Sequence, residues 1–187
     1  STLTRISRVY ICQQSGPEIG VAATKTFTSQ LSVLAQLALR VAKLRGKVSH
    51  QQIEELEEKI MEIPDIVEKT IKENEEKIKQ IAEKYKDRNT FFFLGRGISS
   101  ATAAEGRLKL LEIAYIPSIA YPAGESKHGP ISLVEPGFPV VFVCPRDETH
   151  RTLIGNIMEM KARGASIIAV IEEGDEEIKG LSDDYIE

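Results

Sequence analysis

A nine-residue stretch, PAGESKHGP at positions 122–130, carries three side chains that can do chemistry. Glu125, Lys127 and His128 stand there among glycines and prolines, which direct or restrict the backbone. A histidine side chain ordinarily has a pKa of about 6.5, so it can take up and release a proton at neutral pH. The stretch predicts a stiff loop that positions His128 as a proton carrier, and an ordinary polar surface histidine is the alternative.

A second group of reactive side chains lies in EGRLKLLEIAY, at positions 105–115. On a helix, Glu105, Lys109 and Glu112 fall at spacings i, i+4 and i+7, so their side chains share one face. Carboxylates beside an ammonium group suit general acid–base chemistry, although a plain surface salt bridge explains the same spacing. Gly106 costs roughly 1 kcal/mol relative to alanine inside a helix, which indicates that a neighbouring group approaches closely there.

A third pattern, FFFLGRGISSAT at positions 91–102, joins an apolar run to a helix through Gly95 and Gly97. Ser99, Ser100 and Thr102 stand where that helix begins, and helix N-termini can bind phosphate through free N–H groups and the helix dipole. Plain capping of the helix by Ser99 or Ser100 is the alternative. The pattern lacks the third glycine of a dinucleotide-binding fingerprint.

These residues need a scaffold, and the rest of the chain predicts alternating strands and helices. Apolar, β-branched or aromatic runs predict strands at 8–13, 91–95, 118–121, 138–145 and 166–175, and the final DDYIE leads toward another. Helical spacing predicts helices at 21–44, 49–63, 64–85, 98–115 and 148–163, with Ser49 as the cap of the second and Pro64 as the start of the third. Strands that are apolar on both faces predict an α/β fold with a parallel sheet covered by helices.

Composition limits the class of protein. The chain has 187 residues, a hydrophobic content of 42% and a net charge of −4, so we expect a sizeable core and no nucleic-acid partner. No apolar run approaches the roughly 20 residues of a membrane span, and we expect a cytoplasmic protein without a membrane partner. Cys12 and Cys144 stand in apolar runs and are expected to be buried thiols; no metal ion or cofactor is predicted.

Four linked motifs carry a resemblance to a known family. They are GPEIGVAATKTFTSQL at 16–31, FLGRG at 93–97, EGRLKLLEIAYI at 105–116 and PAGESKHGP at 122–130. In this order and spacing they resemble the isomerase part of the glutamine–fructose-6-phosphate aminotransferase family. That part is similar to two sugar-isomerase (SIS) lobes in tandem, each a flavodoxin-like, three-layer sandwich with a five-stranded parallel sheet. The resemblance implies that residues 1–46 end the first lobe and that residues 47–187 form most of the second.

The resemblance also implies roles for particular residues. Glu112 matches the catalytic glutamate, Lys109 its helix lysine and His128 the histidine that opens the sugar ring. Glu18 and Val21 match positions that line the sugar pocket. The implied substrate is fructose 6-phosphate and the implied product is glucosamine 6-phosphate, formed by ketose–aldose isomerisation with ammonia freed from glutamine.

Partners follow from the same resemblance. It implies a homodimer in which His128 reaches the neighbouring subunit's site, and a glutaminase domain elsewhere in a longer chain. We expect the 187-residue chain alone to be inactive, because the family's phosphate loop and C-terminal lysine have no match here. Two alternatives remain: another SIS-type phosphosugar isomerase or deglycase, and a non-catalytic module that binds sugar phosphates for regulation.

Overall fold

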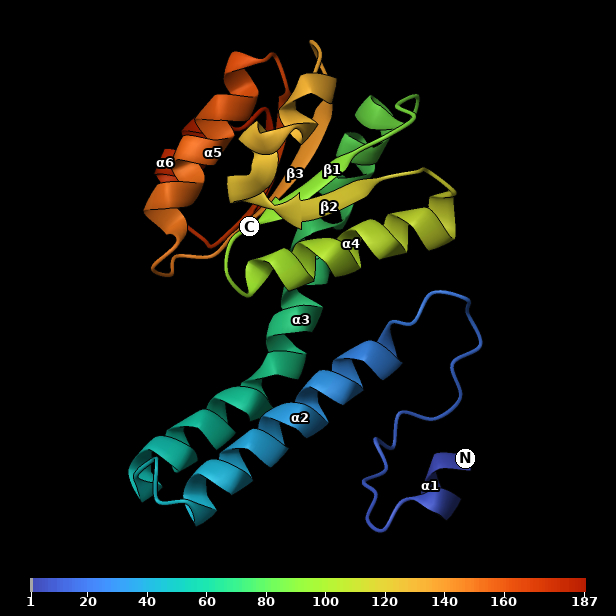
Figure 1. Ribbon diagram of the computed structural model, residues 1–187, viewed down its shortest axis with the longest axis vertical. Helices are drawn as coiled ribbons and strands as arrows, with labels where there is room; N and C mark the ends of the chain where they lie inside the picture. Colours follow the sequence, from blue (N-terminus) through green and yellow to red (C-terminus); the bar gives the residue numbers. More distant parts are fainter. Residues whose placement is uncertain (1) are drawn as a thin grey trace. The chain divides into compact units, whose positions relative to one another are not determined.

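The strands of the computed structural model, which describes residues 2–187, form one five-stranded sheet in which every neighbouring pair is parallel. The strands are β1 (Phe92–Gly95), β2 (Ile119–Pro122), β3 (Pro139–Cys144), β4 (Ser166–Ile171) and β5 (Asp184–Ile186). Their order in the sheet is β2-β1-β3-β4-β5 (Figure 1). The predicted parallel α/β fold is therefore confirmed, with the final DDYIE supplying β5.

Helices cover both faces of this sheet because its strands are apolar on both faces. The helices concerned are α4 (Ser99–Ala114), α5 (His150–Ala162), α6 (Glu176–Leu181) and the last part of α3 (His50–Tyr85). Phe92 and Leu94 pack into the core cluster that contains the buried side chains of α5 and α6. Phe93, which points the opposite way along β1, packs into a second cluster with residues of α3 and α4. The result is a three-layer sandwich.

The sheet and its helices make up one of two compact units, residues 70–187. The other described unit, residues 2–69, holds α1 (Thr2–Ile6), α2 (Lys25–Leu44) and the first part of α3. Gly46, with φ of +60°, ends α2 as predicted. Ser49 caps α3. Its hydroxyl oxygen accepts a hydrogen bond from the backbone N–H of Gln52, and the side-chain oxygen of Gln52 accepts one from the backbone N–H of Ser49.

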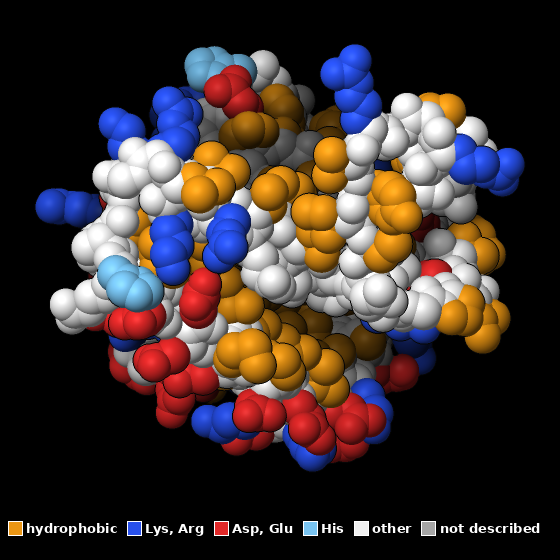
Figure 2. All heavy atoms as spheres, turned by 90° about the horizontal axis from the view of Figure 1, so that it is seen from below, with side chains coloured by type: hydrophobic (Ala, Val, Ile, Leu, Met, Phe, Trp, Pro, Cys, Tyr) orange, Lys and Arg blue, Asp and Glu red, His pale blue; other side chains and the backbone are white. Residues whose placement is uncertain are grey.

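Unit 2–69 leaves many large apolar side chains exposed. On α2 these include Leu31, Leu34, Leu37, Val41 and Leu44. Figure 2 shows apolar side chains, in orange, gathered in groups beside charged ones on the face drawn there. An exposed apolar helix face is stabilised when another surface covers it, so these side chains mark a face suited to a partner.

The strand predicted at 8–13 does not form, and this prediction was wrong. Residues 8–13 have no regular secondary structure, and Val9, Tyr10 and Ile11 are exposed. A strand requires a neighbour for its backbone groups, and no strand is described within residues 2–69 to supply one. Cys12 is therefore exposed rather than buried, while Cys144 at the end of β3 is buried as expected.

The helix break predicted at Pro64 is also absent, because α3 runs from His50 to Tyr85 with Pro64 inside it. A proline at the first turn of a helix and one in its interior look alike in sequence. Here the residues on both sides are mostly strong helix formers, and no glycine stop or capping side chain stands directly before Pro64. The helix therefore continues despite the lost hydrogen bond.

Two short helices, α6 and α1, were not predicted from the sequence. The strand predicted at 166–175 ends at Ile171, because Asp175 accepts a hydrogen bond from the Ile178 amide and begins the unpredicted helix α6. Short α1 was not predicted either. None of the helices described between residues 2 and 187 combines the length and apolar character that crossing a bilayer requires.

Candidate active site

The turn between β1 and α4 fixes where α4 begins. A Cβ on Gly95 would lie 2.4 Å from the carbonyl oxygen of Ser99, so only glycine allows the helix to start this close to the strand. Gly97 follows with φ of +55°, a conformation that glycine adopts without strain. The glycines predicted to form a turn do so, and they fix the direction in which α4 leaves the sheet.

The N-terminus of α4 fits neither of the two interpretations of its serines. The residue at the cap position is Ile98, and no side chain caps the helix. The amides of Ser99 and Ser100 donate to the carbonyl oxygens of Arg96 and Gly97, and the Ser100 hydroxyl donates to Gly95. Because these first N–H groups are already bonded within the turn, they do not offer an open phosphate site.

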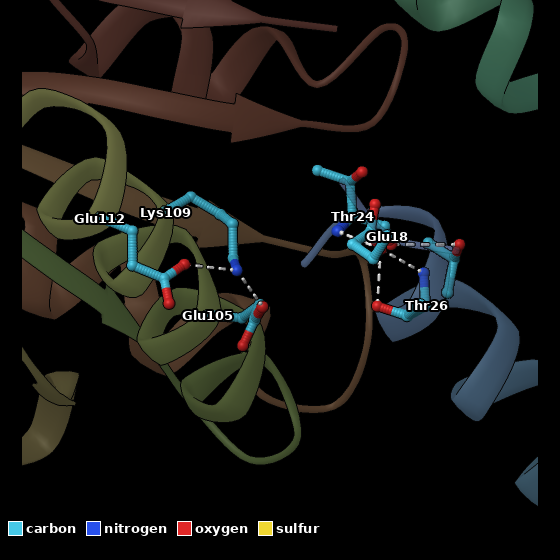
Figure 3. A network of polar contacts seen from close by, with 7 residues as sticks. Glu18, Thr24, Thr26, Glu105, Lys109 and Glu112 are labelled. Carbon is cyan, nitrogen blue, oxygen red and sulfur yellow. Dashed lines mark hydrogen bonds and ion pairs between the residues drawn. The ribbon is translucent and has the colours of Figure 1, made fainter. Parts of the chain in front are cut away.

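The predicted group on α4 is present as a three-membered ionic cluster. The Nζ atom of Lys109 lies 2.9 Å from Oε2 of Glu112 and 3.2 Å from Oε1 of Glu105 (Figure 3). All three side chains are half-buried, with exposed fractions of 22% to 26%. The spacing in sequence had predicted the shared face, and the structure adds that one ammonium bridges both carboxylates.

The electrostatics of this cluster keep Lys109 protonated. The hydrogen bond to Glu112 raises the pKa of Lys109 most, partial burial opposes it, and the bond to Glu105 adds to the rise. The ammonium therefore carries its charge at neutral pH beside two carboxylates. Such an arrangement can place a carboxylate base on a substrate carbon while a fixed cation faces the negative charge that develops.

Packing against the sheet sets the rotation of α4. Gly106 lies on the ring of Phe93, where an added Cβ would be 3.4 Å from the nearest ring carbon. Leu110 packs beside the cluster that contains Phe91 and Tyr85. The close approach inferred from Gly106 is therefore present, and it turns the face that carries Lys109 away from the sheet.

The His128 loop consists of two short turns, which agrees with the prediction that it forms neither a long helix nor a strand. Residues Ala123–His128 form one 3-10 turn (η1) and Pro130–Leu133 form another (η2). Ser126 is buried and its hydroxyl donates to the carbonyl oxygen of Ala123, while Gly129 between the turns has φ of +140°. His128 itself is exposed. The loop thus presents the imidazole on a fixed backbone.

One copy of the chain does not bring Glu112 and His128 together. Helix α4 begins at the carboxyl edge of the sheet and runs antiparallel to β2, so Glu112 lies near the opposite edge (Figure 1). Its distance from the start of the helix is about 20 Å along the axis. His128 follows the carboxyl end of β2. A site that used both groups would have to draw them from two copies.

Glu18 and Val21 lie in unit 2–69, on the segment before α2. The Glu18 carboxylate accepts hydrogen bonds from the Thr26 hydroxyl, the Thr26 amide and the Thr24 amide, at 2.6, 3.0 and 3.3 Å (Figure 3). These bonds, those of Thr26 foremost, lower the pKa of Glu18. Val21 is 88% exposed. Glu18 therefore caps the start of α2, a role that its sequence separation of eight residues from Thr26 concealed.

Within residues 2–187, no group of three or more histidine, cysteine, aspartate and glutamate side chains could hold a metal ion. The Nε2 atom of His150 lies 2.6 Å from Oδ2 of buried Asp175. The contact joins the start of α5 to the cap of α6. No sequence signal linked these residues, because 25 positions separate them.

Comparison with known proteins extends these observations. The model of the SIS domain family matches residues 84–186. The chain is 46% identical over 183 residues to the glutamine–fructose-6-phosphate aminotransferase of Thermococcus kodakarensis, an alignment that covers 98% of this chain and 30% of that protein. The protein of the same name from Pyrobaculum aerophilum is 45% identical over 171 residues, with 91% and 28% covered. The chain thus spans less than a third of these relatives' length.

A solved structure matches over a larger share of its length. The C-terminal domain of glucosamine-fructose-6-phosphate aminotransferase from Francisella tularensis superimposes with a TM-score of 0.91 and is 41% identical in sequence. The match covers 95% of this chain and 49% of that one. The fold is therefore similar to that of a domain that carries this name.

Proposed function

The chain belongs to the SIS domain family, and we propose that it is the isomerase part of an enzyme that makes glucosamine 6-phosphate from fructose 6-phosphate and glutamine-derived ammonia. The similarity to proteins of that name supports the proposal over most of the chain. The observation that carries it is the Glu105–Lys109–Glu112 cluster, because a base beside a fixed cation is what proton transfer between two sugar carbons requires.

The proposed chemistry is proton transfer throughout. His128 accepts the proton of the anomeric hydroxyl and returns it to the ring oxygen, so the ring opens and the C2 carbonyl is exposed. Ammonia replaces the carbonyl oxygen, which leaves as water, and forms an imine at C2. Glu112 removes a proton from C1 and delivers it to C2, while the C1 hydroxyl gives up its proton and the imine nitrogen gains one, which leaves an aldehyde at C1 and an amine at C2. General acid–base catalysis of this kind typically contributes about 10²- to 10⁴-fold.

Lys109 has a supporting role in this scheme. Its raised pKa keeps the ammonium charged, so it offsets the negative charge that grows on the substrate as C1 loses its proton. Glu105, on the far side of Lys109, fixes the direction of the ammonium. Glu18 and Val21 are proposed to line the sugar pocket, with Glu18 acting through the backbone it holds at the start of α2.

Assembly is part of the proposal. Because one chain keeps Glu112 and His128 near opposite edges of the sheet, His128 of a second copy is proposed to complete each site in a homodimer. We propose residues 1–46 as the end of a first SIS lobe and residues 47–187 as most of a second. The enzyme is proposed to act in the cytoplasm, in hexosamine biosynthesis, with its glutaminase domain elsewhere in the longer chain and with the isolated 187-residue chain inactive.

Substitution of Glu112 tests the proposal. In the full-length enzyme that carries this chain, Glu112→Gln keeps the shape of the side chain but removes the base. We expect kcat to fall at least 100-fold, with substrate binding and solvent-deuterium exchange at C1 and C2 followed in parallel. Binding should stay within a few-fold of the parent, and exchange should stop.

The matched control is Glu76→Gln, which removes the carboxylate from an exposed pair of the same i, i+3 spacing, Glu76–Lys79 at 2.7 Å. It should leave kcat unchanged. Equal rates for Glu112→Gln and Glu76→Gln would mean that the α4 cluster is only a salt bridge and would refute the assigned role.

A further inference from the structure

A separate cleft of about 470 Å³ opens at the carboxyl edge of the sheet. Arg96 enters it from the turn after β1, Lys127 from η1 after β2, and Arg151 and Asn156 from α5 after β3. The Glu105–Lys109–Glu112 cluster does not line it, and Glu112 lies near the opposite edge of the sheet. The cleft is thus distinct from the carboxylate–lysine group used in the proposed reaction.

The cleft stands where the order of the strands reverses. From β1 the chain passes through α4 to β2 on one side, and it then returns to place β3 on the other side of β1. Helices that leave neighbouring strands in opposite directions leave a crevice outside the carboxyl ends of those strands, which is where open α/β sheets bind ligands. Arg96 and the first turns of α5 form the two walls of this crevice.

Asn156 and Gly124 fix the position of the Arg96 side chain in the cleft. Its Nη1 atom donates to Oδ1 of Asn156 at 2.9 Å, and Asn156 is only 4% exposed. A Cβ on Gly124 would lie 2.8 Å from the same Nη1 atom, so glycine there leaves the room that the guanidinium occupies. Of the five N–H donors of an arginine, the bond to Asn156 accounts for one, and no other hydrogen bond of this side chain is found among residues 2–187.

The remaining charges in the cleft favour an anion. Lys127 pairs with Glu159 at 3.3 Å, and Glu159 also accepts from the side-chain amide of Asn156 at 3.2 Å. The guanidinium of Arg151 is exposed on the rim and makes no hydrogen bond or ion pair within the described part of the chain. Glu125 is the second carboxylate of the lining. Three cations against two carboxylates leave the cleft positive, with both guanidinium groups open to a ligand.

We infer that this cleft binds the phosphate group of a small phosphate monoester, held by Arg96 and Arg151. A planar guanidinium matches two phosphate oxygens at once, and the buried Asn156 fixes one such fork in advance. The site does not depend on the proposed reaction, because it uses none of the residues assigned to proton transfer. It provides a second place at which a sugar phosphate can act on the protein.

Titration of the 187-residue chain with defined ligands tests the inference. ¹⁵N-labelled chain is titrated with glucose 6-phosphate, inorganic phosphate and glucose at constant ionic strength. Saturable shifts of the Gly124 and Gly155 amides are expected with both phosphates, and none with glucose. Arg151→Gln should weaken the apparent affinity at least threefold and Arg96→Gln at least tenfold, while Arg163→Gln, at the exposed end of α5 outside the cleft, should leave it unchanged.

The outcomes separate this site from others. Glu112→Gln should keep the binding, so its loss in that variant would assign the phosphate to the other site and overturn the inference. Amide shifts that never saturate would reveal non-specific anion association and would overturn the inference as well. An apparent affinity that falls equally in Arg163→Gln and Arg151→Gln would do the same. Circular dichroism checks the fold of Arg96→Gln. If that variant unfolds, the affinity of Arg151→Gln tests the inference, because Arg151 is exposed and its substitution should leave the fold intact.

Discussion

At the scale of single residues, two carboxylates that were both expected to act at a sugar site have different surroundings. Glu112 shares Lys109 with Glu105 on one helix face, which spacing alone predicted. Glu18 was expected to line a sugar pocket, and its carboxylate holds the backbone of Thr24 and Thr26. The sequence predicted the shared face of Glu112 and Lys109 because helical spacing is local. The bonds of Glu18 could not be predicted, because they depend on how the irregular segment before α2 folds back onto the start of that helix.

The pH dependence of Glu18 follows from these bonds. Hydrogen bonds from Thr26 lower its pKa, so the carboxylate stabilises the fold above the ordinary value of 4.5. That stabilisation is lost as the pH falls through the lowered pKa, because protonation removes an acceptor. We expect the Thr26 amide signal in an NMR titration to move with a midpoint below 4.5.

The variant Glu18→Gln should abolish this titration of the Thr26 amide. The control Glu58→Gln, an exposed residue of α3, should preserve it. An unchanged titration in Glu18→Gln would assign the effect to another group and contradict the capping role.

At the scale of elements, α4 is the part that sequence described best. Its glycine turn, the shared face of Glu105, Lys109 and Glu112, and the close contact at Gly106 were all predicted from residues 91–115 and are confirmed. The strand at 8–13 and the helix break at Pro64 were wrong, for different reasons. A strand needs a neighbouring strand, which the local sequence does not specify. Proline occurs both at the first turn of a helix and inside one, and the helix formers on both sides of Pro64 carry α3 through it.

The contact between Gly106 and Phe93 predicts opposite results for two substitutions. Gly106→Ala adds a methyl at ordinary contact distance, 3.4 Å from the ring, and gains helix propensity of up to about 1 kcal/mol. Gly106→Leu forces α4 away from the sheet and costs roughly 1–3 kcal/mol. Urea unfolding of both variants measures the difference.

Stabilisation by alanine with destabilisation by leucine is the expected pattern for Gly106. If leucine is tolerated as well as alanine, the packing of α4 on Phe93 does not limit the position of the face that carries Lys109 and Glu112. Gly180, which has open space around it, is the control site for the same pair of substitutions.

At the scale of the whole molecule, the separation of Glu112 and His128 and the exposed apolar face of α2 both call for a second surface. A symmetric homodimer in which each site takes His128 from the neighbouring subunit would bring Glu112 and His128 together. Such a dimer predicts that two inactive variants restore activity when mixed, whereas a site contained in one subunit does not.

Mixing two inactive variants of the full-length enzyme tests the shared site. Glu112→Gln and His128→Asn are each expected to be inactive. After joint refolding, half of the dimers are mixed and each carries one intact site, so about a quarter of the parental activity should return. Absence of any recovery, in a mixture shown by mass spectrometry to contain mixed dimers, would place both groups in one subunit.

Sequence by itself determined the parallel α/β class, the shared face of Glu105, Lys109 and Glu112, and the irregular backbone of the His128 loop, since each follows from local spacing or backbone chemistry. Tertiary structure decided the cleft around Arg96, the tie between His150 and Asp175, and the placement of Glu112 and His128 near opposite edges of the sheet. These contacts join positions far apart in the chain. They depend on which strands become neighbours, and local patterns of side chains do not specify that order.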